Sequence, residues 1–225
     1  MKLKKSLQIA ALAITVTAPM AATADQKTVM ITPTLESINV VHKGKKVTIK
    51  RLGGKDHLIP APYNKTSRAC PPFCIQPMEV VPGVETIGEL EMIELLKRVS
   101  NGDKTVLVVD SRTPDWIARG TIPGSVNIPW NQITVESMGS MFETEEEENR
   151  FNQILTDQFG AKKTDSGWDF SNAKTLALYC NGLWCPQSSI NIKTLTKLGY
   201  PVHKLKWYRG GMQDWVSVGL NTVNK

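Results

Sequence analysis

The chain has 225 residues, of which 41% are hydrophobic and 21% are charged, enough for one well-packed domain with a smaller appendage. Its net charge of +6 belongs to the N-terminal part, because residues 25–82 hold nine Lys/Arg and four Asp/Glu, whereas residues 83–225 hold fifteen and seventeen. Without a dense Lys/Arg stripe or interleaved aromatic residues, nucleic-acid binding gains little support.

The first 24 residues are predicted to be a secretory signal peptide. Three lysines precede an apolar stretch at residues 7–18, and a run of small residues ends at Ala24. A membrane anchor is disfavoured, because this stretch is shorter than the ~20 residues that span a bilayer and Pro19 interrupts it. We therefore expect cleavage after Ala24, a periplasmic or secreted location, and no membrane span in the mature chain.

The next segment, residues 25–83, is predicted to be an extension of β-strand and loop. Two β-branched runs in residues 37–52 flank a Lys-Gly-Lys turn, which is typical of a hairpin. We call residues 59–83 the arm. Its prolines disfavour both helix and β-ladder, so we expect an extended, irregular chain there. Within the arm, Cys70 and Cys74 of the sequence CPPFC predict a turn closed by a disulfide, with a redox pair as the alternative.

Residues 84–225 show a different pattern, in which buried strands alternate with helices. Short apolar runs predict strands at residues 105–111, 124–130, 175–180 and 202–211, and helical spacing predicts helices at residues 86–99, 148–160 and 189–200. Thr86 and Glu89 are expected to form a capping box at the start of the first helix. The alternation predicts an α/β domain with a mostly parallel sheet, whose active loops lie at the carboxyl ends of the strands.

Cys180 stands where a predicted strand ends and a helix begins a few residues later. The intervening Cys180 loop, residues 180–187, continues with Asn181, Gly182, Leu183, Trp184, Cys185, Pro186 and Gln187. In such a turn the backbone N–H groups curl around the sulfur, and the helix N-terminus adds partial positive charge. Both effects favour thiolate over thiol and lower a pKa that is roughly 8.5 in a free cysteine. We therefore expect Cys180 to be a nucleophile, with Trp184 walling its pocket.

Two stretches resemble rhodanese domains. Residues 106–130, VLVVDSRTPDWIARGTIPGSVNIPW, are similar to the first-strand signature, and residues 176–220 are similar to the remainder, with a cysteine at a strand end, a helix, LGY and GG…W…GL. The resemblance covers about residues 84–225. It implies a three-layer fold with helices on both faces of the sheet, preceded by the small β/loop extension.

The resemblance also implies sulfur transfer, with no cofactor. Cys180 would take the sulfane sulfur of thiosulfate or of a persulfide donor, become a persulfide, and pass that sulfur to a thiol or to cyanide. The substrates would be small sulfur-containing anions and thiols. Loop N–H groups would stabilise both the persulfide and the leaving sulfite.

The Cys180 loop departs from the rhodanese pattern in its charge. Many rhodaneses close this loop on an arginine, whereas no Arg or Lys stands between Cys180 and Lys193. A donor anion would rely on backbone N–H groups, the helix dipole and a charge from elsewhere, for which Arg112 and Arg209 are candidates. The loop also looks longer than usual, as in related phosphatases, but Pro186 stands where those enzymes need an arginine.

Cys185 leaves more than one chemistry open. As a resolving or protecting thiol it would attack a Cys180 persulfide or close a disulfide with Cys180; otherwise it packs as a small hydrophobe. The first role makes a periplasmic thiol-disulfide oxidoreductase, served by a redox protein partner, the main alternative function. A non-catalytic rhodanese-fold binding module is the third hypothesis.

The cysteine count admits other pairings as well. A zinc site built from all four cysteines is conceivable, but an oxidising compartment and the catalytic setting of Cys180 disfavour it, so no metal is expected. Four cysteines allow three disulfide pairings, among which the sequence does not choose. The sulfur donor and acceptor, the role of the extension and the oligomeric state also stay open.

Overall fold

The computed structural model describes residues 29–54, 57–134, 142 and 144–224. The predicted signal peptide, residues 1–24, lies outside these ranges. No helix in the described ranges combines the length and the apolar composition that crossing a bilayer demands.

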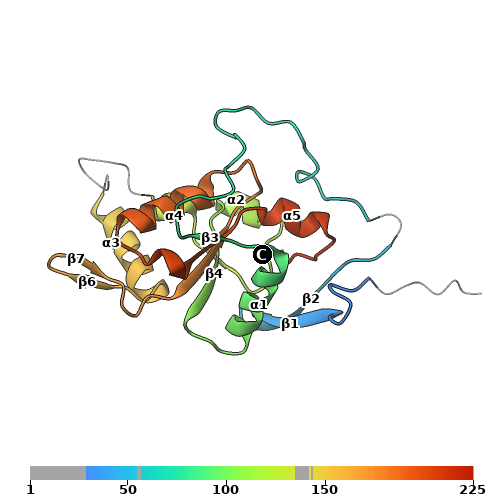
Figure 1. Ribbon diagram of the computed structural model, residues 1–225, viewed down its shortest axis with the longest axis horizontal. Helices are drawn as coiled ribbons and strands as arrows, with labels where there is room; N and C mark the ends of the chain where they lie inside the picture. The colour runs from blue at the N-terminus through green and yellow to red at the C-terminus, as the bar shows by residue number, and fades with distance from the viewer. Residues whose placement is uncertain (1–28, 55–56, 135–141, 143, 225) are drawn as a thin grey trace, which may run out of the picture.

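A five-stranded sheet forms the centre of the molecule, and each strand runs parallel to its neighbours (Figure 1). The strand order is β3 (Glu85–Thr86), β9 (Leu205–Tyr208), β8 (Thr175–Tyr179), β4 (Val106–Asp110) and β5 (Val126–Asn127). Leu176 to Tyr179 of the middle strand are buried, because this apolar run is covered on both faces. The carboxyl ends of all five strands lie at one edge of the sheet, and Cys180 directly follows β8 at this edge.

Helices cover both faces of the sheet, as predicted. They are α1 (Glu89–Ser100), α2 (Pro114–Ile117), α3 (Glu145–Gln153), α4 (Gln187–Lys197) and α5 (Gly211–Ser217). Helical turns of other types are η1 (Trp130–Gln132), η2 (Ile154–Gln158) and η3 (Val202–Lys204). Residues of α1 and α5 form one core cluster with Ala177, and residues of α3 and α4 form a second with Leu178. Successive strand residues point to opposite faces, so these neighbours on β8 belong to different clusters. The predicted three-layer α/β fold is thus confirmed.

The N-terminal extension begins with the predicted hairpin. β1 (Ser37–His42) and β2 (Lys45–Lys50) pair antiparallel, with Lys43 and Gly44 between them at φ 50° and 75°. Positive φ at both central residues is the geometry of a two-residue hairpin turn. Ile38 of this hairpin is buried in the same cluster as α1, so the extension shares a core with the sheet.

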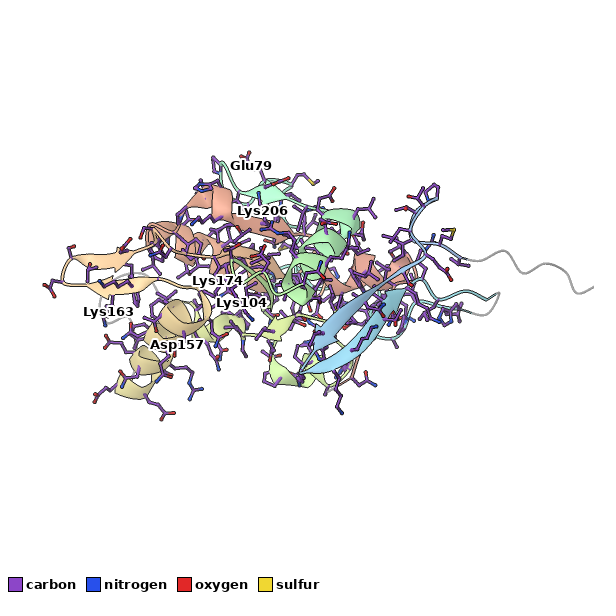
Figure 2. All side chains as sticks on the ribbon, turned by 90° about the horizontal axis from the view of Figure 1, so that it is seen from below. Glu79, Lys104, Asp157, Lys163, Lys174 and Lys206 are labelled. Carbon is purple, nitrogen blue, oxygen red and sulfur yellow. A yellow bond between two sulfur atoms is a disulfide. The ribbon has the colours of Figure 1, made fainter. Side chains whose placement is uncertain are left out.

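A second hairpin, which the sequence analysis missed, lies at the opposite end of the molecule from the first (Figures 1 and 2). It consists of β6 (Lys162–Thr164) and β7 (Gly167–Asp169). Lys163, labelled in Figure 2, forms an ion pair of 3.4 Å with Glu148 of α3. The hairpin is therefore tied to α3 by this ion pair.

The predicted capping box at Thr86 is wrong. Thr86 belongs to β3, where it pairs with Trp207 of β9, and its hydroxyl donates to the Met78 carbonyl. The helix begins at Glu89 after Gly88, whose N–H donates to a Glu91 carboxylate oxygen at 3.0 Å. Pairing with β9 keeps Thr86 extended, so the cap moves two residues along the chain.

Candidate active site

Cys180 follows the last residue of β8 and precedes α4, as predicted. Its carbonyl accepts from the Met212 N–H at 2.9 Å, and the Asn181 carbonyl accepts from the Gln213 N–H at 3.0 Å, so the start of α5 supports the loop. Gly211 makes this approach close: a Cβ there would lie 2.2 Å from the Cys180 carbonyl oxygen, and its φ of 55° favours glycine. Backbone contacts with the start of α5 therefore fix the position of the loop.

The two cysteines of the loop are free thiols and both are buried. Cys180 is 2% exposed and Cys185 is 3% exposed. The Cys180 thiol donates to the Cys185 carbonyl at 3.2 Å, an interaction that supports the neutral thiol. The Cys185 N–H in turn donates to the Gly182 carbonyl at 2.9 Å, which closes a tight turn. The loop thus folds back over the sulfur of Cys180.

Hydrogen-bond donors around Cys180 favour the ionised form. Burial raises the pKa of this thiol, but hydrogen bonds from the Cys185 thiol, from the N–H and hydroxyl of Ser188 and from the Gly182 N–H outweigh burial and lower the pKa to about 7. Burial and the neighbouring Cys180 raise the pKa of Cys185 well above its ordinary value. Of the two thiols, Cys180 is the one that ionises near neutral pH.

Ser188 is a site residue that the sequence analysis missed. It is the second residue of α4 and is 1% exposed. Its hydroxyl oxygen accepts from the indole N–H of Trp207 at 3.1 Å, which leaves the hydroxyl proton for Cys180. The available signal was a serine directly after the Cys180 loop and directly before the predicted helix at residues 189–200.

The other predicted loop residues have mostly structural contacts. The Asn181 side chain accepts from Arg112 at 3.4 Å, and the Trp184 indole donates to Gln213 at 2.9 Å. Pro186 caps α4, and Gln187 is its first residue. In the first turn of α4, the Ser188 N–H donates to the Cys180 sulfur.

The two predicted anion contacts, Arg112 and Arg209, hold other parts of the protein. Arg112 is fully buried and pairs with Asp110 through two hydrogen bonds of 2.8 and 2.6 Å. It also donates to the Tyr63 hydroxyl at 2.8 Å and to the Gly120 carbonyl at 2.8 Å. The arrangement is a buried ion pair that ties the arm to the sheet.

Arg209 anchors the arm near its other end. Its guanidinium donates to the Gln76 carbonyl at 2.7 Å and to the Pro77 carbonyl at 3.0 Å. The Gln76 N–H donates to the Leu183 carbonyl at 2.8 Å, and the Gln76 side chain accepts from the Ser189 hydroxyl at 3.1 Å. Arg209 therefore positions the arm on the Cys180 loop.

The arm lies against the outer side of this loop. The Arg68 guanidinium stacks on the Trp184 ring at 3.5 Å from the ring centroid, and the Phe73 ring meets Trp184 edge-on at 5.7 Å. A disulfide joins Cys70 to Cys74 and encloses Phe73. This bond removes two of the four thiols that the zinc hypothesis needs. In the described residues no cluster of three or more His, Cys, Asp or Glu side chains could hold a metal ion.

Comparison with known proteins places this arrangement in a family. The model of the rhodanese-like domain matches residues 92–218, more than half of the chain. No curated protein sequence matches the chain significantly.

Several solved structures are similar to parts of the chain. A protein from Bacillus halodurans is 18% identical over 62% of this chain and 77% of its own, with a TM-score of 0.39. The human single-domain sulfurtransferase is 21% identical over 60% of this chain and 96% of its own, with a TM-score of 0.35. The polysulfide-sulfur transferase homodimer of Wolinella succinogenes is 14% identical over 65% and 82%, with a TM-score of 0.38. On the strength of the family match, the chain belongs to the rhodanese-like domain family.

Proposed function

We propose that the protein is a sulfurtransferase in which Cys180 carries sulfur as a persulfide. The Cys180 thiolate attacks the outer sulfur of thiosulfate or of a persulfide donor. The donor S–S bond breaks, and sulfite or the donor thiolate leaves with the electron pair. A thiolate or cyanide acceptor then attacks the outer sulfur of the persulfide, and Cys180 leaves as thiolate.

One observation carries this proposal: the Cys180 sulfur lies at the carboxyl end of β8 among donors from Gly182, Cys185 and Ser188. These groups are fixed before the reaction by the loop turn and the first turn of α4. They support negative charge on the attacking sulfur and on the persulfide that replaces it. A thiol with a pKa of about 7 combines a large thiolate fraction with high nucleophilicity at neutral pH.

We also propose that the protein is exported and acts in the periplasm or outside the cell. The support is the N-terminal signature of three lysines, an apolar stretch and Ala24. The Cys70–Cys74 disulfide of the arm is compatible with an oxidising compartment. Sequencing the N-terminus of the protein recovered from the cell envelope tests this, because the proposal requires Asp25 as the first residue.

Mass spectrometry after thiosulfate treatment tests the sulfur-transfer proposal. The wild-type protein should gain one sulfur atom on the peptide that contains Cys180, and Cys180→Ser should gain none. Cys185→Ser is the matched control, because it removes the neighbouring thiol from the same loop and should still accept sulfur. Sulfur retained elsewhere, or none in the wild type, contradicts the proposal.

A second function, thiol-disulfide exchange, is favoured by the contact between Cys180 and Cys185. Their side chains share one buried site and a hydrogen bond. The Cys185 thiolate could attack the inner sulfur of a Cys180 persulfide, releasing HS⁻ and leaving a disulfide, which a redox protein would then reduce. Dithiol reductase activity that requires both cysteines supports this function. Inactivity in both assays would support a non-catalytic binding module.

A further inference from the structure

A pocket of about 680 Å³ lies between the arm and the outer side of the Cys180 loop. Its wall combines two cations with an apolar surface, provided by Lys65, Arg68, Phe73, Ile75, Leu183 and Trp184. Sites for organic ligands commonly have about 300–1,000 Å³ and this mixture of apolar wall and few polar groups. An inorganic anion such as thiosulfate would leave most of such a volume empty.

Arg68 is the residue in this pocket whose hydrogen-bond donors are not all satisfied. Its guanidinium donates to the Pro62 carbonyl at 3.3 Å, but its Nε is buried and has no hydrogen-bond partner among the described residues. The part of the chain that the structure describes offers it no carboxylate within ion-pair distance. A half-buried cation with an unused donor is costly unless an anion completes its partners.

The position of Arg68 links the pocket to the thiols. The guanidinium stacks on Trp184, the residue directly before Cys185, and the Cys185 sulfur acts electrostatically on its charge. Cys180 and Cys185 themselves are buried, and neither is among the residues that line the pocket. Leu183 and Trp184 of the Cys180 loop line the pocket, so a ligand held there contacts the loop that carries both cysteines.

We propose that this pocket binds the anionic, organic part of a thiol or persulfide substrate. Arg68 contacts the anion, Lys65 adds positive charge, and the rings of Trp184 and Phe73 contact the apolar body. The inference rests on the proposed sulfur transfer and names its substrate class, a carboxylated organic sulfur compound. The arm thus supplies the cation that is absent between Cys180 and Lys193.

Calorimetric binding of S-methylglutathione to the full-length protein tests the inference without turnover. This probe is a peptide thioether with two carboxylates, and its blocked thiol cannot reduce the Cys70–Cys74 disulfide. The wild-type protein should bind it at least about ten-fold more tightly than its dimethyl ester, because a hydrogen bond to a charged group is worth roughly that factor. Equal affinities for acid and ester overturn the inference, and this comparison needs no variant.

Variants then locate the anion contact. Arg68→Gln should weaken binding of the acid about ten-fold, and Arg68→Lys should restore part of it, because lysine keeps the charge but loses the planar fork. Lys46→Gln, the same charge change on the exposed face of β2, is the control and should bind like wild type. Unchanged binding in Arg68→Gln, or Arg68-dependent binding of thiosulfate with none of S-methylglutathione, overturns the inference. Failure of the persulfide assay alone leaves this binding result unaffected, so the two proposals fail separately.

Discussion

Substituting Gly211 by alanine tests the support of the Cys180 loop. The added Cβ would lie 2.2 Å from the Cys180 carbonyl oxygen and 3.0 Å from the Gly182 nitrogen. That carbonyl cannot move away freely, because it accepts from the Met212 N–H at 2.9 Å. Gly211 also has a φ of 55°, which costs a residue with a side chain roughly 1–2 kcal/mol.

The expected loss of unfolding free energy is the sum of two costs, the backbone strain at positive φ and the steric overlap of the added Cβ. Overpacking of a well-packed site costs typically about 1–3 kcal/mol, so Gly211→Ala should lose about 2–5 kcal/mol. Gly44→Ala is the matched control, because Gly44 has a φ of 75° and nothing within 4 Å of the added Cβ. It should lose only the roughly 1–2 kcal/mol of backbone strain.

Urea unfolding and the rate of persulfide formation measure the two consequences of Gly211→Ala. The variant should unfold at a lower urea concentration than Gly44→Ala. It should also form the persulfide more slowly, because the backbone that surrounds the Cys180 sulfur must shift. Equal stability of the two variants, together with wild-type persulfide formation in Gly211→Ala, would refute the reasoning.

Three further changes probe the site and its surroundings. Ser188→Ala should raise the pKa of Cys180 above about 7, because it removes a donor to the thiolate, whereas Ser189→Ala should leave that pKa unchanged; the pH dependence of Cys180 alkylation measures both. Asp110→Asn should lose about 3–5 kcal/mol in urea unfolding, because Arg112 is left as an uncompensated buried charge, and wild-type stability would contradict the buried pair. Gln76→Ala should speed alkylation of Cys180, since it weakens the contact of the arm with the loop, and an unchanged rate would show that the arm does not limit access.

The sheet could be predicted from sequence because its middle strands are buried on both faces. The predicted strands at residues 105–111 and 175–180 contain the continuous apolar runs 106–109 and 176–180, and they correspond to β4 and β8. The hairpin of β6 and β7 was missed, because its strands are three residues long and nearly all exposed, so no apolar pattern marks them. The local sequence pattern predicts a helix cap at Thr86, but pairing with β9, which is distant in sequence, keeps the backbone of Thr86 extended.

The position of Cys180 was predictable because strand, turn and helix follow one another locally. The residues that complete the site come from farther away. Gln76 contacts Ser189 across 113 residues of sequence, and nothing in a proline-rich stretch indicates that register. Arg68 was missed for the same reason. Arg112 pairs with Asp110, two residues before it, and donates to Tyr63 of the arm, a contact that a list of charged residues does not reveal.

The proposed chemistry depends on the ionisation of Cys180 near neutral pH. The pH dependence of Cys180 alkylation tests this ionisation most directly. The pKa of Cys180 is lowered to about 7, so the thiolate is present above that pH and is lost as the pH falls below it. The alkylation rate at Cys180, followed by mass spectrometry of its peptide in the full-length protein, should therefore rise with a midpoint near 7. A midpoint at or above the roughly 8.5 of a free cysteine would contradict the account.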